Sequence, residues 1–290
     1  MIEVIRERSA SVVQIQTDSG LGSGVVYDDR GDIVTNNHVV GTAKEFIVTL
    51  AKGDRHKATL VGTFPAGDLA VIRLESGSPA PAPFADSSKA TVGEIVLAIG
   101  NPLGLRSSVT DGIISSLGRT VNAGDGVVIP SAVQTSAAIN PGNSGGALVD
   151  LDSEVVGIPT LAATVPELGG QAAGIGFAIP SNTVRRIADQ LIDTGRVTSS
   201  GRAFLGVEVA TTLQGSGVVV ASVESGGPAD DAGIRRGDIV VAVDGKPTPT
   251  ADDLATVLAG LKPGATVPVT IMRQDGSKAT VRVTLGQSPG

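Results

Sequence analysis

Asn140-Pro141-Gly142-Asn143-Ser144-Gly145-Gly146-Ala147-Leu148 is the most informative segment of this 290-residue chain. A serine set among glycines has no crowding side chains around it, so it can be presented to a substrate. The glycines also let neighbouring backbone N–H groups point to one place. Two such donors can hold the oxyanion of an acyl-transfer reaction, at roughly 3–4 kcal/mol per donor. Ser144 is therefore a candidate nucleophile, although a glycine-rich turn between two strands fits this segment equally well.

The order of the chemical groups along the chain narrows the reaction class. The segment around Ser144 fits the G-x-S-x-G elbow of α/β-hydrolases, but there the acid and the histidine follow the serine. This chain has two histidines, His38 and His56, and both precede Ser144. The subtilisin order is possible with Asp32 and His38, but it needs a parallel α/β architecture that a β-rich sequence does not supply. The order His, Asp, Ser remains, as in chymotrypsin-like double barrels.

The base and its orienting acid are chosen from their local sequence. His38 follows the apolar run Ile33-Val34, whereas His56 lies among charged residues, where we expect an exposed, inert turn. A histidine like His38 is often just a core residue, but the need for a general base favours it. Asp68 opens the apolar run 69–72, where an unpaired charge is costly. Asp68 is the preferred acid. The alternative interpretation is that Asp68 is an ordinary aspartate at the end of a turn. Three other candidates lie in more polar segments: Asp86, Asp111 and Asp125.

Composition excludes several other functions. The chain has no cysteine, which removes disulfides, thiol nucleophiles and cysteine metal sites. With only two histidines, a histidine-rich metal centre is also excluded, so we expect no metal and no cofactor. The net charge of −7 and the absence of a basic cluster argue against nucleic-acid binding. The N-terminal residues 1–7 resemble neither a signal peptide nor a membrane helix.

Short apolar stretches separated by Gly, Pro, Asn or Asp predict about a dozen strands before residue 180. We expect them at 12–15, 24–27, 46–50, 70–72, 95–99, 127–129, 155–158 and 175–179, among others. A helix should follow, capped by Ser181 or Asn182 and ended by Gly195, with an apolar stripe at Val184, Ile187, Ala188 and Leu191. A second β pattern covers 204–209, 217–223, 238–243, 267–273 and 279–285. Within it, a helix begins at Thr250 with Asp253 completing a capping box.

At these residues the sequence resembles the HtrA family of trypsin-like serine proteases with a C-terminal PDZ domain. The resemblance is carried, in the order of the family, by blocks at 22–26, 35–40, 68–71, 100–104, 109–115, 138–148 and 174–180. It implies a mostly β fold, with a double six-stranded β-barrel at 1–195, a linker at 196–203 and a small PDZ domain at 204–290. His38, Asp68 and Ser144 match the catalytic triad, and Gly142, Asn143 and Ser144 match the oxyanion hole.

The resemblance also implies binding sites. Ile139, Ala162 and Ile175 match a shallow apolar specificity pocket, and 162–174 matches a regulatory loop. In the PDZ domain, the loop residues Phe204, Leu205, Gly206 and Val207 match a site for peptide C-termini. Leu254 and Leu258 would line its groove, although helical leucines are often simply core.

The implied function is an endopeptidase for unfolded or damaged proteins, acting in protein quality control and the stress response. The alternatives are a non-catalytic chaperone or scaffold, a PDZ adaptor, and an esterase. We expect an extracytoplasmic location, with the export or anchor segment absent from this sequence, and a cytoplasmic location is the alternative. A homotrimer is implied, although the N-terminal segment lacks the aromatic residues with which such trimers often pack. Ser136 stands where the family commonly has Asp.

Overall fold

The computed structural model describes residues 1–18, 20–77, 79–101, 108–124, 127–140, 142–165, 170–211 and 217–288. For residues 124, 161–165, 170–173 and 211 it describes the backbone alone. The chain forms two compact units. Met1–Arg119 with Ser131–Val197 make the barrel unit, and Thr120–Pro130 with Thr198–Gly290 make the C-terminal unit.

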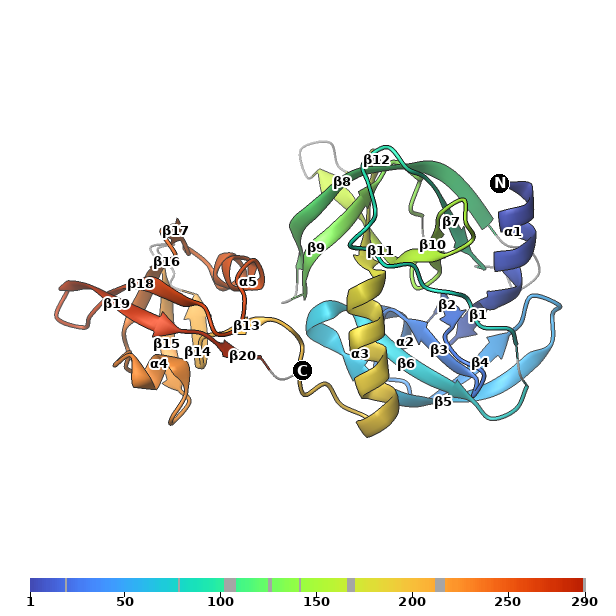
Figure 1. Cartoon of the computed structure of the whole chain (residues 1–290). Coiled ribbons are helices and arrows are strands. Elements are labelled where there is room, and N and C mark those ends of the chain that lie inside the picture. The colour runs from blue at the N-terminus through green and yellow to red at the C-terminus, as the bar shows by residue number, and fades with distance from the viewer. Residues whose placement is uncertain are drawn as a thin grey trace. The chain divides into compact units, whose positions relative to one another are not determined.

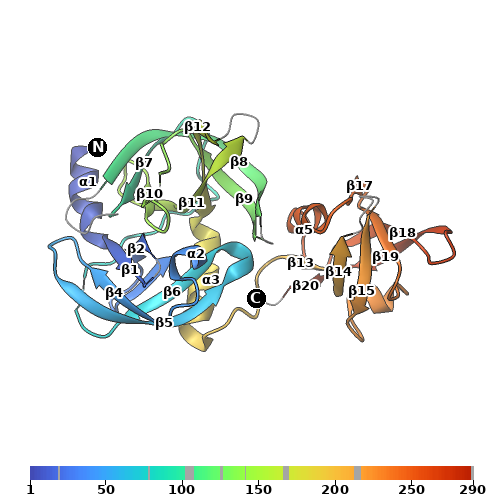
Figure 2. The ribbon, with the colours of Figure 1, turned by 180° about the vertical axis from the view of Figure 1, so that it is seen from behind.

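Apart from the strand ends at 120–130, the barrel unit contains two closed six-stranded barrels (Figures 1 and 2), which confirms the expected fold class. The first barrel has the strand order β1-β2-β3-β6-β5-β4 and the second has the order β10-β11-β12-β9-β8-β7. The strands of the first are β1 Val12–Gln16, β2 Leu21–Val26, β3 Asp32–Thr35, β4 Glu45–Thr49, β5 Arg55–Phe64 and β6 Leu69–Leu74. Those of the second are β7 Ile95–Gly100, β8 Ser108–Gly124, β9 Val127–Thr135, β10 Ala147–Val149, β11 Val155–Val165 and β12 Gly170–Pro180.

Short helices connect and flank the barrel strands. They are α1 Ile2–Arg8, the 3₁₀ turn η1 Ser9–Ser11, α2 Asn37–Val40 and the 3₁₀ turn η2 Pro65–Gly67. The longer α3, Ser181–Thr194, packs against β5 and β6 of the first barrel and against β11 and β12 of the second. Its predicted apolar stripe is buried: Val184, Ile187, Ala188 and Leu191 are each at most 2% exposed. Gly195 ends it in the left-handed region, at φ +72°.

Two local expectations were wrong. The N-cap of α3 is Pro180, and Ser181 is the first helical residue, with its hydroxyl donating to the Ala85 carbonyl at 2.7 Å. Ser181 is completely buried, so its hydroxyl needs a partner within the protein, and it bonds to Ala85 O instead of capping the helix. His56 lies on β5 and is half-buried, with Nδ1 3.3 Å from the Ser76 hydroxyl. The charged neighbours of His56 suggested a turn, but charged residues also occupy the solvent face of a strand.

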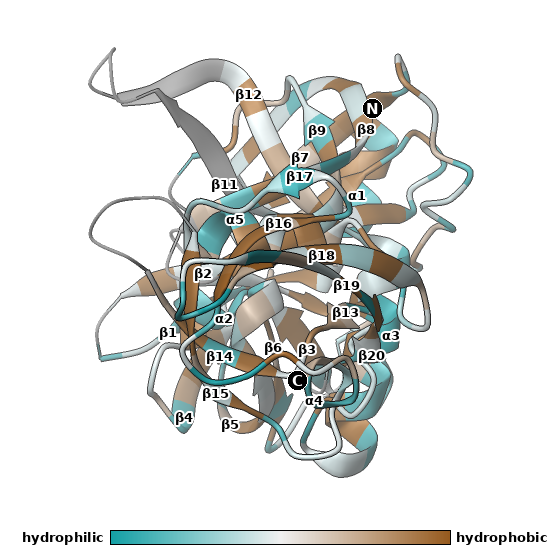
Figure 3. Cartoon of the chain, turned by 90° about the vertical axis from the view of Figure 1, so that its left-hand side faces the viewer, coloured by the Kyte–Doolittle hydropathy of each residue, from teal (hydrophilic) through white to brown (hydrophobic). Residues whose placement is uncertain are grey.

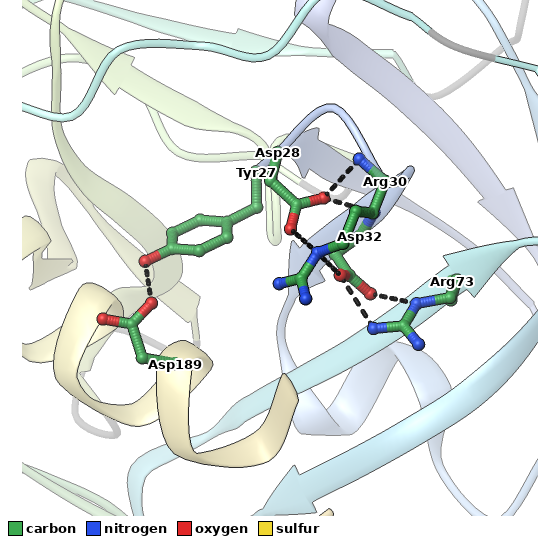
Figure 4. Close-up of polar contacts among 6 residues, drawn as sticks. All are labelled: Tyr27, Asp28, Arg30, Asp32, Arg73 and Asp189. Carbon is green, nitrogen blue, oxygen red and sulfur yellow. Dashed lines mark hydrogen bonds and ion pairs between the residues drawn. The ribbon is translucent and has the colours of Figure 1, made fainter. Parts of the chain in front are cut away.

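The first barrel carries a polar cluster at the turn between β2 and β3 (Figure 4). The buried Asp32 carboxylate accepts from Arg73 Nε at 2.8 Å and from Arg73 Nη2 at 2.9 Å, which ties β3 to β6. At the other side, the Tyr27 hydroxyl donates to Asp189 Oδ1 of α3 at 2.6 Å. Burial, and then this bond to a carboxylate, raise the pKa of Tyr27 well above its usual range. Tyr27 therefore stays neutral and attaches α3 to the first barrel.

The C-terminal unit is a sheet in the order β14-β15-β16-β18-β19, with α5 packed against β14 and β16. Its elements are β13 Ala203–Phe204, β14 Val207–Thr211, β15 Val218–Val223, α4 Pro228–Asp231, β16 Ile239–Val243, β17 Lys246–Pro247, α5 Ala251–Ala259, β18 Thr266–Met272, β19 Lys278–Thr284 and β20 Gly286–Gln287. Hydrophobic and polar residues alternate along strands of this unit (Figure 3). In β18, the buried residues Val267, Val269 and Ile271 recur at the period of two that a half-buried strand requires. The predicted capping box of Thr250 and Asp253 is present at α5.

Candidate active site

The three candidate triad residues lie in segments that connect barrel strands. His38 lies on α2, which follows β3 directly, and Asp68 immediately precedes β6. Because β3 and β6 are paired, with Thr35 opposite Ala70, the two segments emerge side by side. Asp68 adopts φ +53°, in the left-handed region that aspartate tolerates better than most residues. Ser144 lies in the loop before β10 of the second barrel, between Gly142 at φ +105° and Gly145 at φ +79°.

The Asp68 carboxylate makes three contacts with His38, two with the ring and one with the backbone. Its Oδ2 lies 2.9 Å from His38 Nδ1 and its Oδ1 lies 3.1 Å from the same nitrogen. Oδ1 also accepts from the His38 backbone N–H at 3.0 Å. Since a carboxylate only accepts, Nδ1 is the donor in these contacts, which leaves Nε2 of a neutral ring as an acceptor. Asp68 is 4% exposed, whereas the His38 side chain is 51% exposed and open to a ligand.

Ser144 and His38 line the same pocket of about 260 Å³. The other lining residues are Thr17, Gly20, Leu21, Gly22, Val39 and Gly142. The Ser144 hydroxyl donates to the Thr160 carbonyl at 3.2 Å, and no hydrogen bond links it to His38 in the described residues. Both residues line one pocket, but the hydroxyl is bonded to the backbone instead of to the imidazole. Such loose geometry is common in catalytic sites without substrate.

The loop around Ser144 leaves backbone donors available. The N–H of Asn143 donates to Asn140 O at 3.0 Å, and the N–H of Gly145 donates to Pro159 O at 3.0 Å. In contrast, the N–H groups of Gly142 and Ser144 have no acceptor among the residues that the structure describes. The Asn143 side chain is 1% exposed and donates to Ala138 O at 3.2 Å. Among the described residues, the predicted oxyanion loop thus offers two N–H groups without an acceptor next to the candidate nucleophile. The buried Asn143 side chain holds the loop through its bond to Ala138 O.

The expected specificity pocket is only partly described. Ile139 is 5% exposed and packs against Gly176, where a Cβ atom would collide with the isoleucine. Ile175 is 36% exposed and precedes that glycine on β12. The Ala162 side chain lies outside the described residues, as do the side chains of the predicted regulatory loop up to 173 and residues 102–104 of the block at 100–104.

Comparisons with known proteins bear on the whole chain. The family profile of a trypsin-like peptidase domain matches residues 22–158, and that of a PDZ domain matches residues 203–285. Serine endoprotease DegS of Escherichia coli (strain K12) is 39% identical over 293 residues, covering 98% of this chain and 81% of DegS. The solved HtrA-type protease AlgW with tripeptide is 33% identical with a TM-score of 0.69, covering 100% of this chain and 97% of that one. The chain belongs to the HtrA family of serine proteases.

Two further relatives agree. Serine protease PepD of Mycobacterium tuberculosis is 41% identical over 300 residues, which cover 96% of this chain. The crystal structure of the serine endoprotease from Yersinia pestis is 35% identical with a TM-score of 0.67, and covers 99% of this chain and 97% of that one. This HtrA chain spans 64% of the length of PepD and 55% of the DegP-like protease of Chlamydia trachomatis. Within the described residues, no helix is long and apolar enough to cross a membrane.

Thr160 of β11 is a site residue that the sequence did not reveal. Its hydroxyl donates to Asp68 Oδ2, and its carbonyl accepts from the Ser144 hydroxyl at 3.2 Å. Thr160 is 4% exposed, and its contact with Asp68 is buried, whereas its contact with Ser144 is partly buried. One residue of the second barrel thereby touches the acid of the first barrel and the nucleophile of the second. Threonine is a common strand residue, and nothing in its neighbours distinguishes it.

Ser23 of β2 is the second such residue, and it links the first barrel to the Ser144 loop. Its hydroxyl donates to Gly142 O at 2.5 Å and accepts from the Asn101 N–H at 2.8 Å. Its backbone N–H donates to Ser144 O at 3.1 Å. Ser23 is completely buried, and a Cβ atom on Gly145 would collide with its carbonyl. Ser23 therefore fixes the Gly142–Asn143 peptide group of this chain from the opposite barrel.

The candidate peptide site of the C-terminal unit lies between β14 and α5. β14 pairs only with β15, so its other edge is unpaired within the described strands. Gly206 adopts φ +78° in the turn between β13 and β14, and the N–H groups of Leu205 and Gly206 have no acceptor in the described part of the chain. Leu205 is 1% exposed and Phe204 is half-buried. The structure thus combines a free strand edge with backbone donors at one end.

The two helical leucines differ in environment. Leu254 is 4% exposed and belongs to the hydrophobic core of the C-terminal unit, whereas Leu258 is only partly buried against that core. Leu258 is therefore the better placed of the two to contact a peptide. Val207 is half-buried at the start of β14, where it pairs with Val223.

Proposed function

We propose that this chain is a serine endopeptidase that hydrolyses internal peptide bonds through an acyl-enzyme on Ser144. The observation that carries the proposal is the set of contacts around His38. Its Nδ1 is held by the buried Asp68 carboxylate at 2.9 Å, while its ring lines one pocket with Ser144. A serine, a base and an orienting acid in this arrangement are the parts that acyl transfer needs.

In the proposed reaction, the Ser144 hydroxyl turns from the Thr160 carbonyl toward His38 Nε2, which removes its proton as Oγ attacks the scissile carbonyl. The carbonyl oxygen becomes an oxyanion, and the free N–H groups of Gly142 and Ser144 are the donors available to it. Asp68 keeps the imidazole oriented and stabilises the imidazolium that forms. His38 then gives the proton to the leaving amine, and a water molecule repeats the sequence to release the acid.

The test is the reactivity of Ser144. A fluorophosphonate probe should label the wild-type chain once, at Ser144, and labelling and casein cleavage should both vanish in Ser144→Ala. His38→Ala should also lose cleavage, because nucleophile and base act as one unit. His56→Ala is the matched control and should keep wild-type turnover, since His56 does not line the pocket. Casein cleavage retained by purified Ser144→Ala would refute the assignment.

The acyl side of the substrate should be aliphatic. Ile139 and Ile175 carry no charge that could pair with Lys, Arg or Asp, and we include Ala162 in the same pocket because of the family resemblance. Cleavage should therefore follow Val, Ala or Leu. Substrates should be unfolded chains, because an internal peptide bond must leave its own secondary structure to reach Ser144.

We further propose that residues 1–195 act as the protease domain, 196–203 as a linker and 204–290 as a PDZ domain that binds peptide C-termini. The free edge of β14 supports addition of a peptide as a strand, and the free N–H groups of Leu205 and Gly206 support binding of its carboxylate. In the Ser144→Ala chain, a peptide with an apolar C-terminal residue should bind at least tenfold more tightly than its amidated form. Equal affinity of the two forms, measured by fluorescence anisotropy, would contradict this role.

The family relationship supports two broader proposals. Relatives named periplasmic serine endoproteases support an extracytoplasmic location and a role in protein quality control. The family resemblance also supports a homotrimer, which light scattering of the purified chain would measure directly.

A further inference from the structure

Asp68 holds the base of the triad from a backbone conformation that needs support. Its φ of 53° and ψ of 42° lie in the left-handed region, which costs free energy for any residue with a side chain. Such a conformation persists where the surrounding contacts fix it. The Asp68 N–H donates to Pro65 O at 3.0 Å, within the turn that precedes it. The Asp68 carbonyl is held from a different segment of the first barrel.

That contact comes from Asn36, which directly follows β3. Asn36 Nδ2 donates to the Asp68 carbonyl at 3.0 Å. The Asn36 side chain is completely buried, so it lies out of reach of a substrate. Its Oδ1 has no partner among the described residues. The side-chain amide of Asn36 therefore acts on Asp68, and it does so through its nitrogen.

The place of Asn36 in the chain makes this bond unexpected. Asn36 is the N-cap residue of α2, where the side-chain oxygen of an asparagine ordinarily accepts a backbone N–H. In the part of the chain that the structure describes, Asn36 makes no such capping bond. The N–H of His38, two residues on, donates to Asp68 Oδ1 at 3.0 Å instead. Asp68 thus caps the helix that carries the base, and Asn36 in turn holds the backbone of Asp68.

The unpaired oxygen of Asn36 indicates what its amide contributes. A buried acceptor without a partner destabilises the folded state. An apolar side chain of the same shape would remove that unfavourable group, but it would also remove the donor to the Asp68 carbonyl. The amide is therefore more important for the conformation of Asp68 than for the packing around Asn36.

We propose that Asn36 is a positioning residue for the reaction, because its amide keeps Asp68 in the conformation from which the carboxylate reaches both the backbone and the ring of His38. The inference rests on the proposed endopeptidase function, which it extends to a residue that touches no substrate. The contacts run from Asn36 Nδ2 to Asp68 O, and from Asp68 Oδ2 to His38 Nδ1 at 2.9 Å. Loss of the amide should weaken the orientation of His38 and leave substrate binding unchanged.

The experiment compares Asn36→Leu with Asn182→Leu in the full-length chain. Leucine has nearly the shape of asparagine and no donor. Asn182 is the matched control, because its amide also donates, to Asp86 Oδ1 at 2.7 Å, and it lies on α3 and does not line the pocket of His38 and Ser144. With an aliphatic peptide nitroanilide, Asn36→Leu should lower kcat roughly tenfold and keep KM within about twofold of wild type. Asn182→Leu should keep both constants.

A spectroscopic signal follows the effect to His38 without turnover. The proton on His38 Nδ1 that bonds to Asp68 should give a low-field ¹H NMR signal. Because the chain has only two histidines, loss of the signal in His38→Ala identifies it. The signal should move upfield or broaden in Asn36→Leu and stay in place in Asn182→Leu. Folded Asn36→Leu with wild-type kcat, with a change in KM alone, or with an unchanged signal would overturn the inference.

Asn36→Ser is the second variant if the leucine variant does not fold. Serine is smaller than asparagine and is a preferred N-cap residue, but its short side chain lacks the amide donor. It should fold and show the same loss of kcat. If neither variant folds, Asn36 supports the fold rather than the triad, and the inference is overturned. A wild type that cleaves nothing would refute the endopeptidase function itself, whereas the signal in Asn36→Leu would still decide whether Asn36 positions His38.

Discussion

Thr160→Val tests how the two barrels cooperate in the active site, because valine keeps the shape of threonine and removes only its hydroxyl. Asp68 Oδ2 then loses one of its two partners and keeps His38 Nδ1 at 2.9 Å. Asp68 is 4% exposed, so water does not readily replace the lost donor. A hydrogen bond to a charged group contributes about 1.5–3 kcal/mol.

The expected effect on catalysis follows from that range. Because Asp68 orients His38 throughout the reaction, we expect most of the loss in the transition state. At about 1.4 kcal/mol per tenfold, kcat/KM should fall between roughly 10-fold and 150-fold. The Ser144 hydroxyl bonds to the backbone carbonyl of Thr160, which valine retains, so the serine should remain in place.

The assay is cleavage of an aliphatic peptide nitroanilide, with fluorophosphonate titration to count active sites and thermal melting to establish that the variant is folded. Thr160→Ser restores the hydroxyl without the methyl group and is the matched control, which should keep kcat/KM within about threefold of wild type. The reasoning is refuted if folded Thr160→Val cleaves as fast as wild type. It is also refuted if the serine and valine variants lose the same activity, because then the methyl group matters rather than the hydroxyl.

Two further predictions concern the polar contacts of Ser23 and Tyr27. Ser23→Ala leaves Gly142 O and the Asn101 N–H without partners, so it should lower the free energy of unfolding by about 2–4 kcal/mol and also slow fluorophosphonate labelling of Ser144. Ser181→Ala, which removes an equally buried hydroxyl bonded to Ala85 O, should be destabilised but label at the wild-type rate, and equal labelling of both variants would contradict the role of Ser23. Tyr27 is the only tyrosine of a chain without tryptophan, so absorbance at 295 nm reports its ionisation alone, and its midpoint should lie well above the usual value of about 10. Since the folded state keeps this proton and the unfolded state loses it, the free energy of unfolding should fall as the pH rises above about 10, and it should fall less in Tyr27→Phe. Asp189→Asn should lower the midpoint of Tyr27 ionisation. An unchanged midpoint in that variant would contradict the contact.

The sequence by itself determined the strands, the order of the chemical groups and the family. Strands at 12–16, 69–74 and 95–100 follow from apolar runs bounded by turn residues, because the strand pattern is local. His38, Asp68 and Ser144 were selected because the chain has only two histidines and no cysteine, so few assignments had to be compared. The local pattern was insufficient at two residues. Ser181 makes a tertiary contact with Ala85 instead of the expected helix cap, and His56 lies on strand β5 instead of in the expected turn.

Only the tertiary structure decided which ordinary residues surround that triad. Thr160 and Asp68 are 92 residues apart in the sequence, and Ser23 and Gly142 are 119 apart. The packing of the two barrels against each other brings each pair into hydrogen-bonding distance. Serine and threonine are common in strands and turns, and a buried hydroxyl has no signature in its neighbours along the chain. Leu21 likewise looks like any first residue of a strand, and it becomes a wall of the pocket because β2 begins beside His38 and Ser144.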